Sequence, residues 1–329
     1  MTKSFRMCLL TLATYMVSVH ATVTIAHAQS HNVANPFVDH ADSGEVIHVL
    51  PTPASSHSPW DTQATDAPVA NGTAVYPASY GSGQLQYHGG RIMPSPSYYA
   101  VYWNASVAMA VQDQIQAFVT NFPDNHNWDN SPTDDYEVIQ QYGGSNGFPA
   151  NTLTFLGTFV DSKPAQSTIK DTAIRNYLSS LFANRGLTAS ADTLYGIYFP
   201  SGMKIVLSGG TSCSSFCGYH SHYAYNGIQI KYAVFPYPDC SGCSLSGKSV
   251  ADMLTIVSSH EIREAVSDPG DNGVNAWYDA AGYEADDKCA WHNLYQMTNG
   301  GFWVQPEYSN GGTVGSATYP GPGCVVPNR

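Results

Sequence analysis

The stretch that decides the fold of this chain is residues 249–269, SVADMLTIVSSHEIREAVSDP. Its apolar residues recur every three or four positions, which is the spacing of one face of an α-helix. Ser249 is suited to cap the helix start, and Asp252 stands three residues later, as in a capping box. Pro269 prevents the helix from continuing. The pattern predicts one long helix with an apolar stripe.

Ionisable side chains continue this apolar stripe. At about 100° per residue, the stripe that begins at Met253 passes through His260, Glu264 and Asp268, with Glu261 at its edge. An ionised carboxylate without a partner in a dry site costs about several kcal/mol, and two side by side cost more. A bound cation would resolve this problem, because the i, i+4 spacing places His260 and Glu264 on one side.

Two arrangements without a metal would also satisfy these acids. The polar end of the helix face could reach solvent, or Arg263 and Lys288 could form ion pairs with the carboxylates. The chain supplies few cations for this purpose, because it has 13 lysines and arginines against 25 aspartates and glutamates. This balance favours a bound metal.

His260 to Glu264 form the sequence HEIRE, which is similar to the HExxH motif of zinc peptidases with Glu in place of the second His. Carboxylate is a zinc ligand, but it is harder than imidazole and moves the preference towards calcium or manganese. Glu284 follows Glu264 by twenty positions. This arrangement resembles the gluzincin peptidases, in which a Glu at about that distance is the third protein ligand. The resemblance implies His260, Glu264 and Glu284 as metal ligands and Glu261 as the group that polarises the attacking water.

A group of acidic residues follows the helix in predicted loops. Their hard oxygen donors suit calcium: Asp268, Asp279, Glu284, Asp286 and Asp287. Asp287 is also placed to orient a metal ligand. The zinc and calcium interpretations are compatible, since a calcium ion could brace the loop beside a zinc site.

His220 and His222 are further candidates. If their segment is extended, both side chains face one side, where one could complete the metal shell or bind a tetrahedral intermediate. The alternative is a disulfide-braced surface loop with solvated histidines. Tyr278 and His292 are candidate donors to a transition state.

Residues 1–28 predict a signal peptide, with Lys3 and Arg6 before an apolar stretch and Ala26-His27-Ala28 as the cleavage pattern. The alternative is an uncleaved N-terminal anchor. We expect a secreted protein, extracellular or periplasmic, without a membrane segment once the signal is removed. The formal net charge of −12 excludes nucleic acid as an expected partner.

Six cysteines follow the signal, and an even number in an exported chain predicts disulfides, with 15 possible pairings. They are Cys213, Cys217, Cys240, Cys243, Cys289 and Cys324. A zinc site on the first four is the alternative. We expect Cys289 to pair with Cys324.

A single domain is predicted over residues 84–329, preceded by a low-complexity linker or pro-segment over 29–83 that is rich in Ser, Thr, Ala, Pro and Gly. Strands are expected at 98–103, 152–160, 193–199 and 228–235, and helices at 106–119, after Pro132 and at 171–183. The residues from Asp268 on are expected to be mostly loop. The predicted class is α/β or α+β: a mixed sheet with packed helices, a zincin-like active-site helix and disulfide-braced loops.

Several segments resemble the secreted phosphate-induced protein 1 (EXORDIUM-like) family: YHGGRIM at 87–93, the strand at 98–103, CGYH at 217–220 and CSGC at 240–243. The portion from 259 to 269, WYD at 277–279 and DKCAW at 287–291 look like exported microbial relatives of it. The similarity covers roughly residues 85–325. The plant members are extracellular cell-wall proteins linked to growth, so the resemblance implies export and the fold and leaves catalysis open.

These patterns favour a secreted metal-dependent hydrolase, a zinc endopeptidase that acts on a protein or peptide. The alternative is a non-catalytic extracellular protein that is stabilised by calcium and contacts a cell-wall polymer through its 22 tyrosines and 6 tryptophans. A glycoside hydrolase is a third, more distant hypothesis, since paired carboxylates also suit that chemistry.

Overall fold

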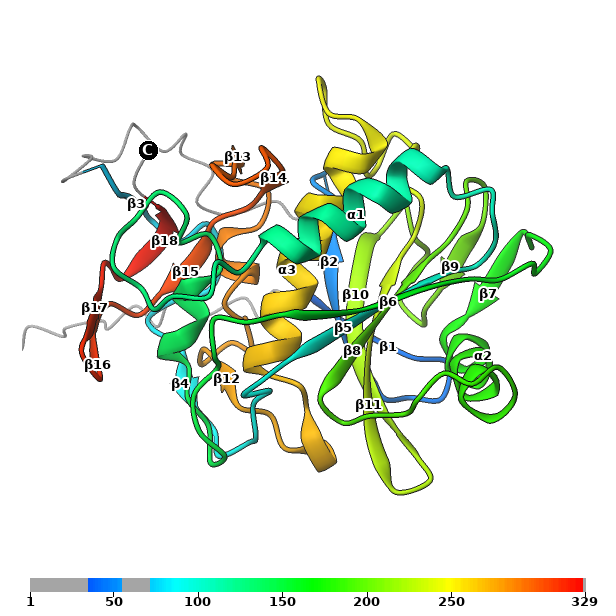
Figure 1. Cartoon of the computed structure of the whole chain (residues 1–329), viewed down its shortest axis with the longest axis horizontal. Helices are drawn as coiled ribbons and strands as arrows, with labels where there is room; N and C mark the ends of the chain where they lie inside the picture. Colours follow the sequence, from blue (N-terminus) through cyan, green and yellow to red (C-terminus); the bar gives the residue numbers. More distant parts are fainter. Residues whose placement is uncertain (1–34, 55–71, 328–329) are drawn as a thin grey trace, which may run out of the picture. The chain divides into compact units, whose positions relative to one another are not determined.

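Seven strands form the central sheet in residues 35–54 and 72–327, the part of the chain that this computed structural model describes (Figure 1). In spatial order they are β1 (Val38–His40), β2 (Val46–Pro51), β10 (Phe216–Tyr225), β11 (Ile228–Phe235), β8 (Thr193–Tyr198), β5 (Ser97–Tyr102) and β6 (Thr154–Val160). The four strands from β11 to β6 are parallel, whereas β1, β2 and β10 add antiparallel pairs. The sheet is therefore mixed, as predicted.

The interior strands β8 and β11 follow from their apolar sequences. All six residues of β8 are buried, and so are the last six of β11. A parallel strand covered on both faces carries a continuous apolar run, which is the pattern of TLYGIY in β8. The four strands expected from sequence are confirmed as β5, β6, β8 and β11.

Three helices pack on the two faces of this sheet within the described residues: α1 (Met109–Asn121), α2 (Asp171–Asn184) and α3 (Val250–Ser267). Because side chains alternate along a strand, Tyr198 packs with α1 and α3, whereas Ile197 packs with α2 on the other face. Figure 1 shows α1 and α3 together and α2 apart from them. The result is a three-layer α/β arrangement, and the predicted fold class is confirmed.

The helix α3 forms as its sequence predicts. The Ser249 side chain accepts a hydrogen bond from the backbone N–H of Asp252 at 3.1 Å, and the Asp252 carboxylate accepts one from the Ser249 N–H at 2.9 Å. Such a cap stabilises a helix by about 1 kcal/mol. Burying a side chain such as Leu254 or Val257 adds about 1.5–3 kcal/mol. Nearly the whole helix is buried between the sheet and the C-terminal segment.

The segment expected to be a linker needs a correction. β1 and β2 lie within it and extend the central sheet beside β10, and β3 (Ala74–Tyr76) pairs with β18 (Gly323–Val326). The compact unit begins at Asn35, so the predicted boundary at residue 84 is wrong. Six residues of β2 give too short a pattern to stand out from polar surroundings, and their burial depends on pairing with a distant strand. The predicted signal peptide lies outside the described residues.

The C-terminal part is largely loop, as expected, but short strands interrupt it. They are β12 (Trp277–Tyr278), β13 (Tyr295–Gln296), β14 (Trp303–Val304), β15 (Glu307–Ser309), β16 (Gly312–Val314), β17 (Ala317–Tyr319) and β18. The residues that the structure describes also contain three short 3-10 helices: η1 (Glu137–Gln141), which lies earlier in the chain, and η2 (Asp271–Gly273) and η3 (Asp287–Cys289) in the C-terminal part. The remaining strands pair as β4 (Gln86–Tyr87) with β12 and β7 (Thr168–Lys170) with β9 (Lys204–Val206). The C-terminal part of the chain places η3 and the residues before it against α3.

Three disulfides use all six expected cysteines: Cys213–Cys240, Cys217–Cys243 and Cys289–Cys324. The predicted disulfides and the expected Cys289–Cys324 pair are therefore confirmed, and the alternative of a cysteine zinc site is wrong, because those thiols are paired with one another. Cys217–Cys243 joins the start of β10 to the segment before α3. Cys289–Cys324 joins η3 to β18.

Candidate metal centre

The polar end of α3 lies against β10 because β10 has a glycine at the crossing point. A Cβ on Gly218 would come within 2.4 Å of Val257 Cγ1 and 3.0 Å of Glu261 Oε1, so only glycine allows this approach. Side chains two residues apart on a strand share a face. His220 therefore points to the same side as Gly218 and meets Glu261 on α3.

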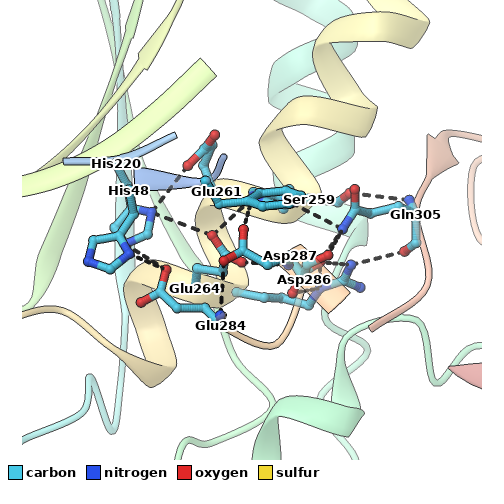
Figure 2. A network of polar contacts seen from close by, with 12 residues as sticks. His48, His220, Ser259, Glu261, Glu264, Glu284, Asp286, Asp287 and Gln305 are labelled. Carbon is cyan, nitrogen blue, oxygen red and sulfur yellow. Dashed lines mark hydrogen bonds and ion pairs between the residues drawn. The ribbon is translucent and has the colours of Figure 1, made fainter. Parts of the chain in front are cut away.

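Glu264 stands at the middle of a buried cluster (Figure 2). Its Oε2 lies 2.9 Å from His260 Nε2 and 3.8 Å from His220 Nδ1. Its Oε1 accepts a hydrogen bond from the backbone N–H of Asp287 at 2.8 Å. Glu261 completes the cluster on the side of β10, with Oε2 3.2 Å from His220 Nδ1. Residues from separate segments of the chain thus contact the carboxylate of Glu264.

Glu284 adds a second carboxylate and brings a histidine that sequence reasoning missed. Its Oε2 lies 3.1 Å from His48 Nδ1 and 3.7 Å from His220 Nε2. His48 stacks on His220 with 5.5 Å between ring centroids. The apolar pairs Val46-Ile47 and Val49-Leu50 on either side of His48 are too short a run to predict a strand within a segment of linker-like composition.

Two further residues orient the cluster. Asp287 Oδ2 accepts the backbone N–H of Glu284 at 2.9 Å, so Asp287 contacts both glutamates, as expected for a positioning residue. Gln305 Nε2 lies 3.1 Å from His260 Nδ1 and donates to the Asp286 carboxylate at 3.0 Å. No motif in the sequence marks Gln305; only the fold of the C-terminal segment brings it to α3.

The two alternatives without a metal fail for the central glutamates. Arg263 forms an ion pair with Asp286 and lies 3.6 Å from Glu307, while Lys288 pairs with Asp279 at 2.8 Å. Within the described part of the chain, no lysine or arginine pairs with the central glutamates, and their side chains are at most 1% exposed. These three are Glu261, Glu264 and Glu284. Neither solvent nor a lysine or arginine of the described residues therefore compensates them, and their neighbours are imidazoles.

Burial governs the protonation of the centre. It raises the pKa of Glu261, Glu264 and Glu284 well above the usual carboxyl range, and neighbouring carboxylates raise these pKa values further. Burial also lowers the pKa of His48 to about 4 and that of His220 well below its usual value. The imidazoles are therefore neutral, which is the form that binds a metal.

Atoms without a hydrogen bond gather at this point: His220 Nε2, His260 Nε2, Glu261 Oε1 and both carboxylate oxygens of Glu284. Buried polar atoms are normally satisfied, so this concentration calls for a ligand. One ligand atom each from His220, Glu261 and Glu264 lies within 4.8 Å of the others, and the same holds for His260, Glu264 and Asp287. These donors fit a divalent cation.

A cavity of about 480 Å³ reaches the centre from outside. His48, His220 and Asp268 line it, together with His222 and Tyr278. His220 is buried in β10, so the interpretation of this run as a surface loop is wrong, because pairing with β2 and β11 orders it. His292 packs against Tyr80 instead of joining the centre.

The acids expected to bind calcium are mostly engaged by protein donors. Asp279 pairs with Lys288 and accepts the backbone N–H of Ala281 at 2.8 Å. Asp268 Oδ1 accepts the N–H of Ala276 at 2.6 Å, and burial raises its pKa to about 7. Asp279 and Asp286 thus have a lysine or arginine partner, whereas Asp268 lies within hydrogen-bonding reach of Glu284 and adjoins the centre.

The fold and the site define an α/β protein with three disulfides in its described residues and a buried histidine–carboxylate centre open to a cavity. Comparisons of this chain with protein-family models, curated proteins and solved structures gave no match. The resemblances to the EXORDIUM-like family and to gluzincins therefore stay predictions. None of the helices among the described residues is both long and apolar enough to cross a bilayer.

Proposed function

We propose that this chain is an exported metal-dependent hydrolase, a zinc endopeptidase that cleaves protein or peptide substrates. The observation that carries the proposal is the set of buried glutamates beside a cavity, which have histidine neighbours but no lysine or arginine partner among the described residues. Glu264 would hold the metal together with His220, His260 and Glu284. The ligands expected from sequence, His260, Glu264 and Glu284, are thus joined by His220 of β10.

The donor set favours zinc over calcium. Calcium sites consist of oxygen ligands, whereas imidazole suits zinc. His220, His260 and His48 all lie within this cluster. Two of the acids that suggested calcium, Asp279 and Asp286, already have a lysine or arginine partner.

A zinc ion bound there would supply Lewis-acid chemistry, polarising a carbonyl group and lowering the pKa of water. Glu261 would accept the proton, because its carboxylate lies beside His220 and next to the proposed ligand Glu264. His220 contacts Glu261 and also lines the cavity, so it would orient this base towards the substrate. Tyr278 lines the cavity, where its hydroxyl could donate to a developing oxyanion.

The test combines metal content with hydrolysis of casein. After dialysis against zinc, the parent protein should hold zinc at this centre and cleave casein. Glu264→Gln should bind one zinc ion fewer than the parent and lose cleavage, and Glu261→Gln should keep the zinc content of the parent but lose cleavage. Asp113→Asn, which removes an exposed carboxylate on α1, is the matched control and should behave as the parent. Casein cleavage by Glu261→Gln at the parent rate would refute the proposal.

The same measurements distinguish this proposal from the alternative of a non-catalytic, calcium-stabilised extracellular protein. That hypothesis expects calcium instead of zinc after dialysis against both ions, retention on cell-wall polysaccharide, and no effect of Glu261→Gln. Zinc binding with metal-dependent casein cleavage contradicts it.

A further inference from the structure

A second histidine–carboxylate cluster lies in the loop between α1 and η1, formed by residues that the α3 centre does not use. One ligand atom each from Asp124, His126 and Asp134 lies within 4.8 Å of the other two. His126 Nδ1 is 3.6 Å from Asp134 Oδ1, and its Nε2 contacts Asp124 Oδ2. Three side chains of a short loop thus face one point.

Glu137, the first residue of η1, adds a buried carboxylate that lacks compensation. Its side chain is wholly inaccessible to solvent, and Oε1 has no hydrogen bond. The carboxyl group lies within hydrogen-bonding reach of Asp124. Glu137 Oε1 is therefore a buried acceptor beside Asp124 for which the described residues provide no hydrogen-bond donor.

The side-chain amide of Asn151 also contacts the cluster of Asp124 and His126. Asn151 donates Nδ2 to Asp124 Oδ1 and to the backbone oxygen of His126, while its own Oδ1 is buried without a hydrogen bond. Buried carbonyl and carboxylate oxygens are rarely left in this state. Two unsatisfied acceptors, from Glu137 and Asn151, thus adjoin the cluster of the loop.

We propose that Asp124, His126, Asp134 and Glu137 form a second divalent-cation site. Calcium sites consist of oxygen ligands, whereas this site has one imidazole and three carboxylates. Such a donor set suits a transition-metal ion such as Mn²⁺ or Zn²⁺ better than it suits calcium. The site is independent of the proposed hydrolase activity, because none of its four residues belongs to the α3 centre.

The position of the loop indicates what the ion would do. Trp128 donates Nε1 to the backbone oxygen of Thr318 at 3.1 Å and packs on Tyr319 at 5.6 Å between ring centroids. Asn130 accepts a hydrogen bond from Thr73. An ion that fixes this loop would therefore hold together the N-terminal, middle and C-terminal parts of the described chain, and its main effect is on stability.

Counting bound Mn²⁺ by the loss of its free electron paramagnetic resonance signal tests the site. Measured in the Glu264→Gln background, which removes the central ligand of the α3 centre, the chain should bind one Mn²⁺ that Glu137→Gln abolishes. Asp129→Asn removes an exposed carboxylate from the same loop and should keep the ion. Equal Mn²⁺ binding by the Glu137→Gln and Asp129→Asn chains would overturn the proposal.

Thermal unfolding provides the second measurement. The amide of Glu137→Gln can donate to Asp124, so this variant should fold without metal and be at least as stable as the parent. Mn²⁺ should raise the Tm of the parent and of Asp129→Asn but leave that of Glu137→Gln unchanged. If Glu137→Gln does not fold, His126→Ala, at a partly exposed position, replaces it with the same expectation. An equal rise of Tm in all variants would contradict the site.

Discussion

Nδ1 of His48 lies 3.1 Å from Oε2 of Glu284, although the first residue comes from the N-terminal part of the chain and the second from the C-terminal part. β2 carries His48 to the sheet, and the loop before η3 carries Glu284 to α3. The contact therefore exists only when the sheet and the C-terminal segment are both folded. It links the formation of the candidate metal centre to the completion of the fold.

Removing the imidazole of His48 should weaken metal binding without unfolding the protein. We expect His48→Ala to lower zinc affinity by about 10-fold or more, as for other residues that support metal ligands. Competition with a chromophoric chelator measures the affinity. His40→Ala, an exposed histidine on the neighbouring strand β1, is the control and should bind zinc as the parent does. Unchanged affinity in His48→Ala would exclude His48 from the centre.

Gly218 should be intolerant of a side chain. A methyl group there would meet Val257 Cγ1 at 2.4 Å, and such overpacking costs about 1–3 kcal/mol. Gly218→Ala should therefore lower the free energy of unfolding by that amount in urea titration.

The double variant Gly218→Ala/Val257→Ala provides the control, because it removes the atom that the new methyl group meets. The two substitutions should be less harmful together than the sum of their separate effects. Strict additivity would show that the crossing of β10 and α3 does not depend on this contact.

The Cys217–Cys243 disulfide should stabilise the site as well as the fold. It closes a loop that contains His220 and joins β10 to the segment before α3. Replacing both cysteines by serine should cost about 2–5 kcal/mol, measured by denaturant unfolding. The same substitutions at Cys289 and Cys324 test whether a loss of metal binding is specific to the disulfide beside His220. Parent-like stability in Cys217→Ser/Cys243→Ser would contradict this role.

The Arg175–Glu45 ion pair should make stability depend on pH in the acid range. Arg175 Nη1 lies 3.1 Å from Glu45 Oε1, and hydrogen bonds from Arg175 and Ser43 lower the pKa of Glu45 to about 2. A carboxyl group whose pKa is lowered on folding stabilises the protein above its unfolded pKa of about 4.5, and this stabilisation is lost as the pH falls towards 2.

Because the Glu45 side chain is 52% exposed, the pair is worth about 0.2–1 kcal/mol. Glu45→Gln should therefore be less stable than the parent at pH 7, and the difference should shrink between pH 4.5 and 2. Asp192→Asn, an exposed carboxyl group outside this pair, is the control. A difference between parent and Glu45→Gln that stays constant over this range would refute the assignment.

Sequence reasoning succeeded where the signal is local. The capping box of Ser249 and Asp252 and the apolar period of α3 are contained in a few turns of helix, and the structure has the helix at Val250–Ser267. The apolar run of β8 likewise predicts a buried strand, and so does β11, where Ile228 and Ile230 alternate with polar residues before the run at 233–235. The six cysteines were expected to form disulfides, and of the three pairs only Cys289–Cys324 was named in advance.

Prediction from sequence failed where a segment forms its structure only by pairing with a distant segment. β2 and the start of β10 form because they pair with each other, and neither has a sequence that demands a strand by itself. His48 and Gln305 were missed for this reason.

The sequence by itself determined the helix that carries His260, Glu261 and Glu264 and the spacing of their side chains, because capping and helical period act over neighbouring residues. Only the tertiary structure decided that His220, Glu284 and His48 join them, and that Arg263 and Lys288 neutralise other acids. Side chains from separate segments meet only through strand pairing, disulfides and burial, which no short window of sequence contains.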